Sequence, residues 1–327
     1  MKMTLFAGAA AAALAACGNA GAQEWRTLDV SRQLRDTSAI AAQITYGAGT
    51  FTLGRATGAD LYEMHLRYPA GRTSPVATYT AGTHALHLGI KSQNFSRPGG
   101  DADQNELHIG LAPGVPLDLT TEVAAADVKM DLGGLAVRSL KLKTGATDAT
   151  LAFSSPNTMR MRSMVLNVGA AGFKGTGLAN ANADHIVLRA GIGDWELYFD
   201  GKWTGDITLD AKVGLGSLTV HVPDYVRVDQ NANAVLGAVE GDHAQPAAVD
   251  TSDNDDEADS SDSDNASDDG NAKAAAKSSK PAIVKTKSVT IVKVDTNTPP
   301  RFTLHIVGRA TLGEIAFDHK VGGAGGL

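Results

Sequence analysis

The sequence predicts an all-β fold, a single-stranded β-helix or solenoid with coils of about 21–24 residues. Three observations support this fold: a phrase in which Gly follows an aliphatic residue or Met by three positions, a second phrase of the form apolar-Gly-x-apolar-x-apolar, and a composition with 36 Gly and only 5% aromatic residues. The first phrase recurs at Met130/Gly133, Leu142/Gly145, Leu166/Gly169 and Leu188/Gly191, with Leu209/Lys212 keeping the spacing but not the Gly. The second phrase recurs at Leu132–Val137, Ile192–Leu197 and Leu215–Val220.

Each phrase has a physical reason. Alternation, as in Leu218-Thr219-Val220, places apolar side chains on one face of a strand and polar ones on the other. Gly supplies the positive φ or the close backbone approach that a coil needs where it bends. Ordering each of the roughly 22 residues of a coil costs about 1–2 kcal/mol, whereas only its few inward aliphatic side chains return about 1.5–3 kcal/mol each. A single coil is therefore unstable, and stacking on neighbouring coils is required.

The array extends beyond its clearest part in both directions. The first phrase already appears at Ile44/Gly47, Leu86/Gly89 and Leu107/Gly110, and Leu312–Phe317 repeats the second phrase. Residues 250–270 carry ten Asp or Glu, no Lys or Arg and almost no large apolar residue, so we expect a disordered loop inserted before the last coils. The predicted division is a lipoprotein-type signal peptide over 1–16, β-solenoid over 24–245, a disordered acidic and Lys-rich insertion over 246–280, final strands of the same solenoid over 281–319, and a flexible Gly-rich tail over 320–327.

The N-terminus is typical of an export signal. Lys2 precedes an apolar run, Leu5–Ala16, that is too short to span a bilayer as a helix. The run ends in Leu14-Ala15-Ala16-Cys17, which resembles a bacterial lipobox, and Cys17 is the sole cysteine of the chain. We therefore predict lipidation of Cys17 and a membrane tether. The alternative is ordinary cleavage after Ala22, which would give a periplasmic or secreted protein.

Several of these features together resemble one known family. They are the Gly-x-Gly phrases, the break at Asp200-Gly201, the run Val213–Leu218 and the following Val222-Pro223. They are similar to the toastrack family of bacterial envelope β-solenoids, which includes the C-terminal domain of LiaF-type cell-wall stress regulators and auto-transporter adhesin head domains. The resemblance covers roughly residues 44–228 and 302–317, and it implies a β-solenoid at the envelope with no catalytic residues to carry over.

We find no constellation of residues that indicates catalysis or metal binding. His84 and His87 would point to opposite faces of a strand, whereas zinc needs three or four convergent ligands. Asp194 and Glu196 share one strand face, but the repeats place polar residues outward at the equivalent positions. We predict no enzyme, no cofactor, no metal and no small-molecule substrate. Outside the acidic run the remaining charge is near +3, against −7 for the whole chain, so no basic face indicates nucleic-acid binding.

The candidate contact residues lie near the predicted hairpin at Asp200-Gly201. There, Tyr198 and Trp203 are aromatic residues that could face a partner. The sequence thus favours an exported, lipid-anchored, non-catalytic binding or scaffold module of the outer membrane or cell surface, with an envelope protein or polymer as partner and a role in envelope-stress sensing. The alternative is a surface adhesin or a passive structural envelope protein. A hydrolase built on Asp194 and Glu196 is the least favoured class.

Overall fold

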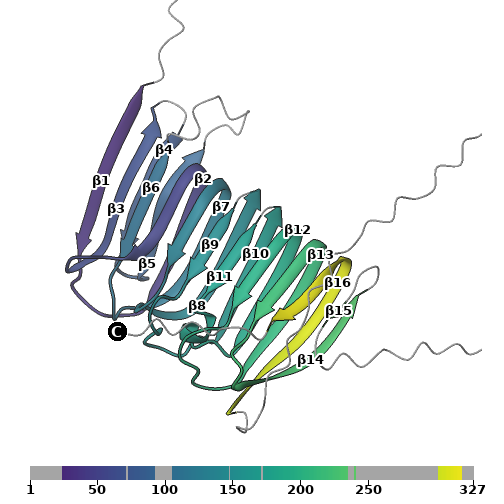
Figure 1. Ribbon diagram of the computed structural model, residues 1–327. Helices are drawn as coiled ribbons and strands as arrows, with labels where there is room; N and C mark the ends of the chain where they lie inside the picture. The colour runs from purple at the N-terminus through teal and green to yellow at the C-terminus, as the bar shows by residue number, and fades with distance from the viewer. Residues whose placement is uncertain are drawn as a thin grey trace, which may run out of the picture.

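The structure is a computed structural model that describes residues 24–70, 73–92, 105–146, 148–170, 172–234, 239–240 and 301–318. Within these residues the chain forms one 16-stranded sheet, wound as a stack of coils (Figure 1). The strands are β1 Trp25–Gln33, β2 Ile40–Arg55, β3 Asp60–Pro69, β4 Thr73–Thr80, β5 Ala85–Ser92, β6 Glu106–Leu111, β7 Pro116–Asp131, β8 Ala136–Ala146, β9 Ala149–Ala152, β10 Ser163–Ala170, β11 Phe173–Thr176, β12 His185–Tyr198, β13 Ile207–His221, β14 Val226–Ala234, β15 Val239–Glu240 and β16 Phe302–Asp318. The predicted all-β solenoid is confirmed. The signal segment, the acidic insertion and the Gly-rich tail lie outside the described residues.

The long strands bend, so the sheet folds into two faces. Strand β7 pairs with β8 through residues 116–123 and with β9 through residues 128–131. Strand β12 pairs with β10 before its bend and with β11 after it. We call the half of the sheet that contains β8 and β10 the first face, and the half that contains β9 and β11 the second face. Strands β2, β7, β12, β13 and β16 run through both.

The core lies between the two faces and is built from stacked rows of equivalent residues. Leu142, Leu166 and Leu188 stand opposite one another on adjacent strands of the first face, and each is fully buried. Trp195 and Leu197 close the core from the second face. Because each row buries the same kind of side chain in successive coils, the sequence repeats the same phrase.

The N-terminal end departs from the parallel pattern. Strand β3 pairs antiparallel with both β1 and β6, and β4 pairs antiparallel with β5. Strand β2 pairs in parallel with β5, β6 and β7, so it joins this region to the regular coils.

The predicted hairpin at Asp200-Gly201 is wrong. Strands β12 and β13 are parallel neighbours over 13 residue pairs, so the chain must cross the end of the coil between them. Residues 199–206 make that crossing. Phe199 and Trp203 are both buried there, and the Trp203 indole Nε1 donates a hydrogen bond of 3.0 Å to the Phe199 carbonyl. The connection therefore packs over the open side of the coil instead of reversing the chain.

Strand β16 lies inside the sheet, between β13 and β14 (Figure 1). The expectation that residues 281–319 supply the last strands of the solenoid differs from this order, because β14 and β15 occupy the terminal position. Strand β16 matches β13 along its whole length, with Gly216 opposite Gly313 and Leu209 opposite Ile306. A strand with apolar residues at the same positions as β13 can pair beside β13, wherever that strand occurs in the sequence. In the sequence, Leu236-Gly237-Ala238-Val239 matches the first four positions of the second phrase, a partial signal for the terminal coil.

Candidate functional site

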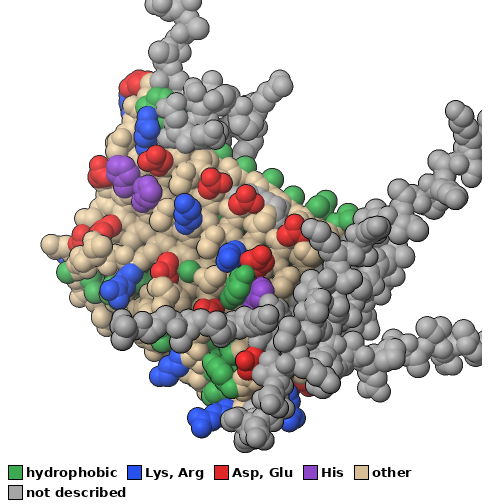
Figure 2. All heavy atoms as spheres, in the orientation of Figure 1, with side chains coloured by type: hydrophobic (Ala, Val, Ile, Leu, Met, Phe, Trp, Pro, Cys, Tyr) green, Lys and Arg blue, Asp and Glu red, His purple; other side chains and the backbone are tan. Residues whose placement is uncertain are grey.

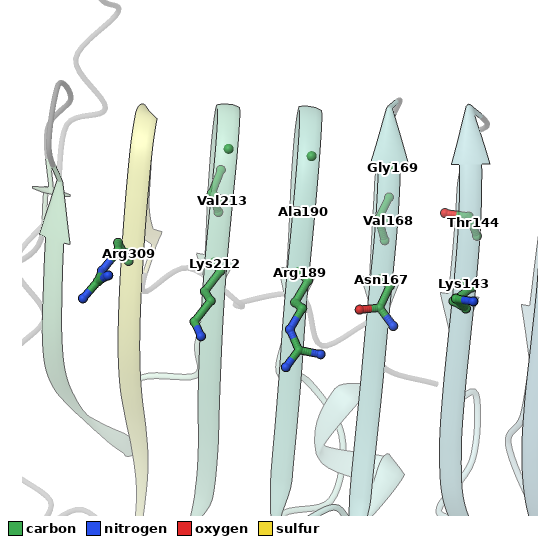
Figure 3. A pocket seen from close by; sticks show the side chains of 12 residues that line it. Lys143, Thr144, Asn167, Val168, Gly169, Arg189, Ala190, Lys212, Val213 and Arg309 are labelled. Carbon is green, nitrogen blue, oxygen red and sulfur yellow. The ribbon is translucent and has the colours of Figure 1, made fainter.

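A line of cations crosses the first face and borders a groove of about 630 Å³ (Figure 3). Lys143 of β8, Arg189 of β12, Lys212 of β13 and Arg309 of β16 occupy equivalent positions, with Asn167 of β10 between the first two. We call these five residues the cationic row. The four charged side chains of the row are exposed.

The sequence interpretation missed this row because it placed one repeat two residues out of register. It took Leu209/Lys212 as a copy of the first phrase that had lost its Gly. In the structure Ala211 stands opposite Leu188, and Lys212 stands opposite Arg189. The copy in β13 is therefore Ala211-Lys212-Val213-Gly214. With that register, the residue after the first position of the phrase is a cation or Asn in each of these strands.

The glycines of the first phrase line the groove next to the cationic row. A Cβ atom built on Gly191 would lie 2.2 Å from the Gly169 carbonyl oxygen, and one on Gly214 would lie 2.4 Å from the Gly191 carbonyl oxygen. Real Cβ atoms do not approach an oxygen so closely, so these positions need Gly. These glycines add no side chains to the groove, and Figure 3 shows the side chains of the cationic row beside it.

Several cations of the neighbouring coils have an acidic partner. Arg138 pairs with Asp118, Arg160 Nε donates to Asp184 at 3.0 Å, and Lys174 Nζ lies 3.5 Å from Glu196. At one end of the cationic row, Lys143 Nζ lies 3.2 Å from Glu122 Oε1.

Arg189, Lys212 and Arg309 differ, because no ion pair joins them to any residue that the structure describes. Asp210 lies on the same face in the adjoining row, opposite Val187 and Val307. Three neighbouring strands therefore present positive charge without a carboxylate partner.

Exposed apolar side chains follow the glycines of the groove along β12 and β13, on the side of the bend. Ile192 and Leu215 are opposite each other on β12 and β13, and they are 60% and 45% exposed. Ala170 of β10 continues this line. Figure 2 shows hydrophobic side chains in a line along the upper right edge of the molecule. The groove thus has cations along one side and an exposed aliphatic edge along the other.

The structure separates the two aromatic residues predicted to contact a partner. Trp203 is only 6% exposed and stacks against Phe302 with ring centroids 6.1 Å apart, so its assignment to a partner surface is wrong. Tyr198 is half-buried on the second face. Its hydroxyl donates to Glu196 Oε2 at 3.0 Å, and its ring stacks on His221 with centroids 4.0 Å apart. Burial, together with Glu196, raises the pKa of the Tyr198 phenol. Cys17, the predicted lipidation site, lies outside the described residues.

The acidic and histidine candidates are held by ordinary surface contacts. Asp194 accepts a hydrogen bond of 2.7 Å from the Ser217 hydroxyl, whereas Glu196 engages Tyr198 and Lys174. His84 lies in the turn before β5, with its Nδ1 3.1 Å from the Tyr79 hydroxyl. Among the described residues, no group of three or more His, Cys, Asp or Glu side chains is arranged to hold a metal ion. In the same part of the chain, no helix has the length and hydrophobicity needed to cross a membrane.

Comparisons with known proteins found one family model and two solved structures that are similar to the chain. A family model described as the N-terminal domain of toast_rack, DUF2154, matches residues 20–174. Two solved structures are similar to the chain: a candidate cell adhesion protein from Clostridium sporogenes, at 11% identity and a TM-score of 0.40, and a candidate adhesin from Bacteroides fragilis, at 10% identity and a TM-score of 0.40. The alignments cover 91% and 90% of this chain and 100% and 98% of the other chains. No curated protein matches the chain.

Proposed function

We propose, from the premise that residues 20–174 carry the N-terminal domain of toast_rack, that this protein is an exported, lipid-anchored and non-catalytic binding module of the bacterial cell envelope. Cys17 would be its tether, and the solenoid would be the binding scaffold. Envelope-stress sensing is the role that this placement favours, since a tethered scaffold can report on the state of nearby envelope components.

The cationic groove is the observation that carries the proposal. It crosses several coils, and its floor is defined by backbone contacts that leave no room for side chains at Gly191 and Gly214. Its cations come from strands that are far apart in sequence, β8 and β16, yet lie in one sheet. Because a rigid scaffold already holds the cations in a line, little conformational entropy is lost when a ligand binds. Such preorganisation favours affinity.

The non-catalytic part of the proposal is supported by the state of the polar residues. Asp194 and Glu196 are exposed, they engage different partners, and the structure gives them no enclosed site. General acid–base catalysis needs a positioned pair within reach of one substrate atom. An open groove along stacked strands suits binding better than it suits chemistry.

The test is mass spectrometry of the mature N-terminus in the native host, with the Cys17→Ala variant as a control. We expect a diacyl or triacyl Cys17 in the membrane fraction and release of the variant from that fraction. A free N-terminus at Gln23 in a soluble exported protein would reject the tether. Cross-linking in intact cells would then test the module itself: recovery of no envelope component with the lipidated protein would reject the binding role.

A further inference from the structure

We propose that the cationic groove binds an extended anionic polymer, whose phosphate or carboxylate groups follow the cationic row across the strands. The inference rests on the proposed function as a binding module and adds the class of ligand. It also assigns Arg189, Lys212 and Arg309 as the residues that contact the anionic groups.

The geometry of the row favours a linear ligand. Arg189, Lys212 and Arg309 lie on three consecutive strands, β12, β13 and β16. Adjacent strands of a sheet are about 4.8 Å apart, so the three positions form a line with a cation at each step of that spacing. Lys143 extends the line beyond Asn167 on the far side of β10. A compact anion is best bound by cations that converge on one point. Here the cations are spaced along a line, which suits the successive charged groups of a polymer.

The charge of the row favours an anionic partner from outside the sheet. Like charges directly opposite each other on neighbouring strands destabilise a sheet. Elsewhere in the sheet, Arg138 pairs with Asp118, and Lys174 lies close to Glu196. Arg189 faces Lys212, and Lys212 faces Arg309. A bound polyanion would remove the repulsion, because each guanidinium can donate two parallel hydrogen bonds to a phosphate or carboxylate group.

The rest of the first face favours a narrow ligand over a broad anionic surface. Asp118, Asp210 and Asp229 lie on the same face, in rows next to or beyond the cationic row. A bilayer surface would bring these carboxylates against lipid phosphates. A single chain in the groove would meet a lining that contains cations, glycines and small or uncharged side chains but no carboxylate.

Fluorescence anisotropy on the purified full-length chain tests the inference, with labelled polyphosphate and labelled polygalacturonate as separate probes. We expect binding of at least one polymer to weaken with salt, with a slope of log K against log salt of about −2 to −3, since each contacted charge contributes roughly 0.7 for a single-stranded polyanion. The variant R189A/K212A/R309A should lose at least about tenfold in affinity and reduce the magnitude of the slope by about 2. Longer chains should bind more tightly than short ones until they span the row.

The control variant is Lys129→Ala, which removes an exposed cation from the second face. It should keep the affinity and the salt slope of the unmodified protein. The melting temperature of each variant should be at least as high as that of the original, because the substituted side chains are exposed and the triple variant also removes the like-charge repulsion within the row.

Equal binding by the triple variant and the original would overturn the inference. So would binding to phosphatidylglycerol vesicles without binding to either soluble polymer, which would instead make the groove a membrane contact. Neither result bears on the lipid at Cys17, so the two proposals fail separately.

Discussion

The regular coils and the N-terminal region use the same alternation of apolar and polar residues but different strand pairing. From β7 onward, every paired strand that the structure describes runs parallel to its neighbour. Before β7, strands β1, β3, β4, β5 and β6 include antiparallel pairs. The comparison teaches that the alternation builds strands in both regions but does not by itself decide whether neighbouring strands run parallel or antiparallel.

The two regions also differ in how polar groups contribute to stability. In the coils, Asn157 is buried and makes three hydrogen bonds: it donates to the Val137 and Ala181 carbonyls at 2.8 and 3.0 Å and accepts from the Val137 amide at 2.8 Å. In the N-terminal region, the pair formed by His65 and Asp29, 2.5 Å apart, is exposed. Buried hydrogen bonds are costly to remove, whereas exposed ion pairs contribute little. We therefore expect substitutions to have larger effects in the coils.

The largest effect is expected for Gly216→Ala. Gly216 has a φ of +130°, and an added Cβ would lie 1.7 Å from the Gly193 carbonyl oxygen. Backbone strain and overpacking together should cost roughly 3 kcal/mol or more of unfolding free energy. Gly114→Ala is the matched control, because Gly114 has a φ of +78° but no atom within 4 Å of the added Cβ. It should cost about 1–2 kcal/mol, measured by chemical denaturation. Similar losses for both variants would show that the close stacking at Gly216 does not matter.

The second effect is expected for Asn157→Ala. The substitution leaves the Val137 amide and two carbonyl groups without their side-chain partner in a buried site. We expect a loss of about 2–4 kcal/mol in unfolding free energy. Asn180→Ala, which removes a half-buried side chain, should cost less. If Asn157→Ala melted at the same temperature as the original protein, the role of Asn157 in holding the coils together would be rejected.

The third prediction concerns acid stability. Burial works to raise the pKa of Asp118, but hydrogen bonds from Arg138 and Ser139 and nearby positive charge outweigh it, so the pKa is lowered from 3.8. Because the folded-state pKa lies below the unfolded-state value, ionised Asp118 stabilises the fold above pH 3.8, and this contribution is lost as the pH falls through the folded-state pKa. Asp118→Asn should therefore reduce the denaturation midpoint at neutral pH and have a smaller effect near about pH 3. A reduction of the same size at both pH values would contradict the linkage.

The smallest effect is expected for Asp29→Asn in the N-terminal region. The Asp29 and His65 side chains are 75% and 45% exposed, so solvent screens their interaction. The change in unfolding free energy should stay within about 0.5 kcal/mol. A larger loss would show that the antiparallel region depends on this pair as strongly as the coils depend on Asn157, and would weaken the comparison.

Local chemistry made the general architecture predictable. Alternation in segments such as Leu218-Thr219-Val220 determines which side chains a strand can bury, and glycine marks the bends because few other residues adopt the required backbone. The near-constant spacing of the phrases then implies coils that stack. Each of these features depends only on residues that are close together in the sequence. The sequence alone therefore predicted an all-β solenoid, and the structure confirms it.

Tertiary structure decided which strands meet and in which register. Residues 211–214, not 209–212, align with the first phrase, because that register keeps whole rows of apolar residues buried along β12 and β13. Strand β16 enters between β13 and β14, and Trp203 packs into the core, for the same reason.

The cationic row follows from that register. Lys143 and Arg309 come from opposite ends of the coil array, and no local pattern of residues reports that they share one row. The register depends on burying many side chains from distant parts of the chain at once. The sequence by itself therefore determined the strands and their bends, whereas only the assembled sheet determined the groove.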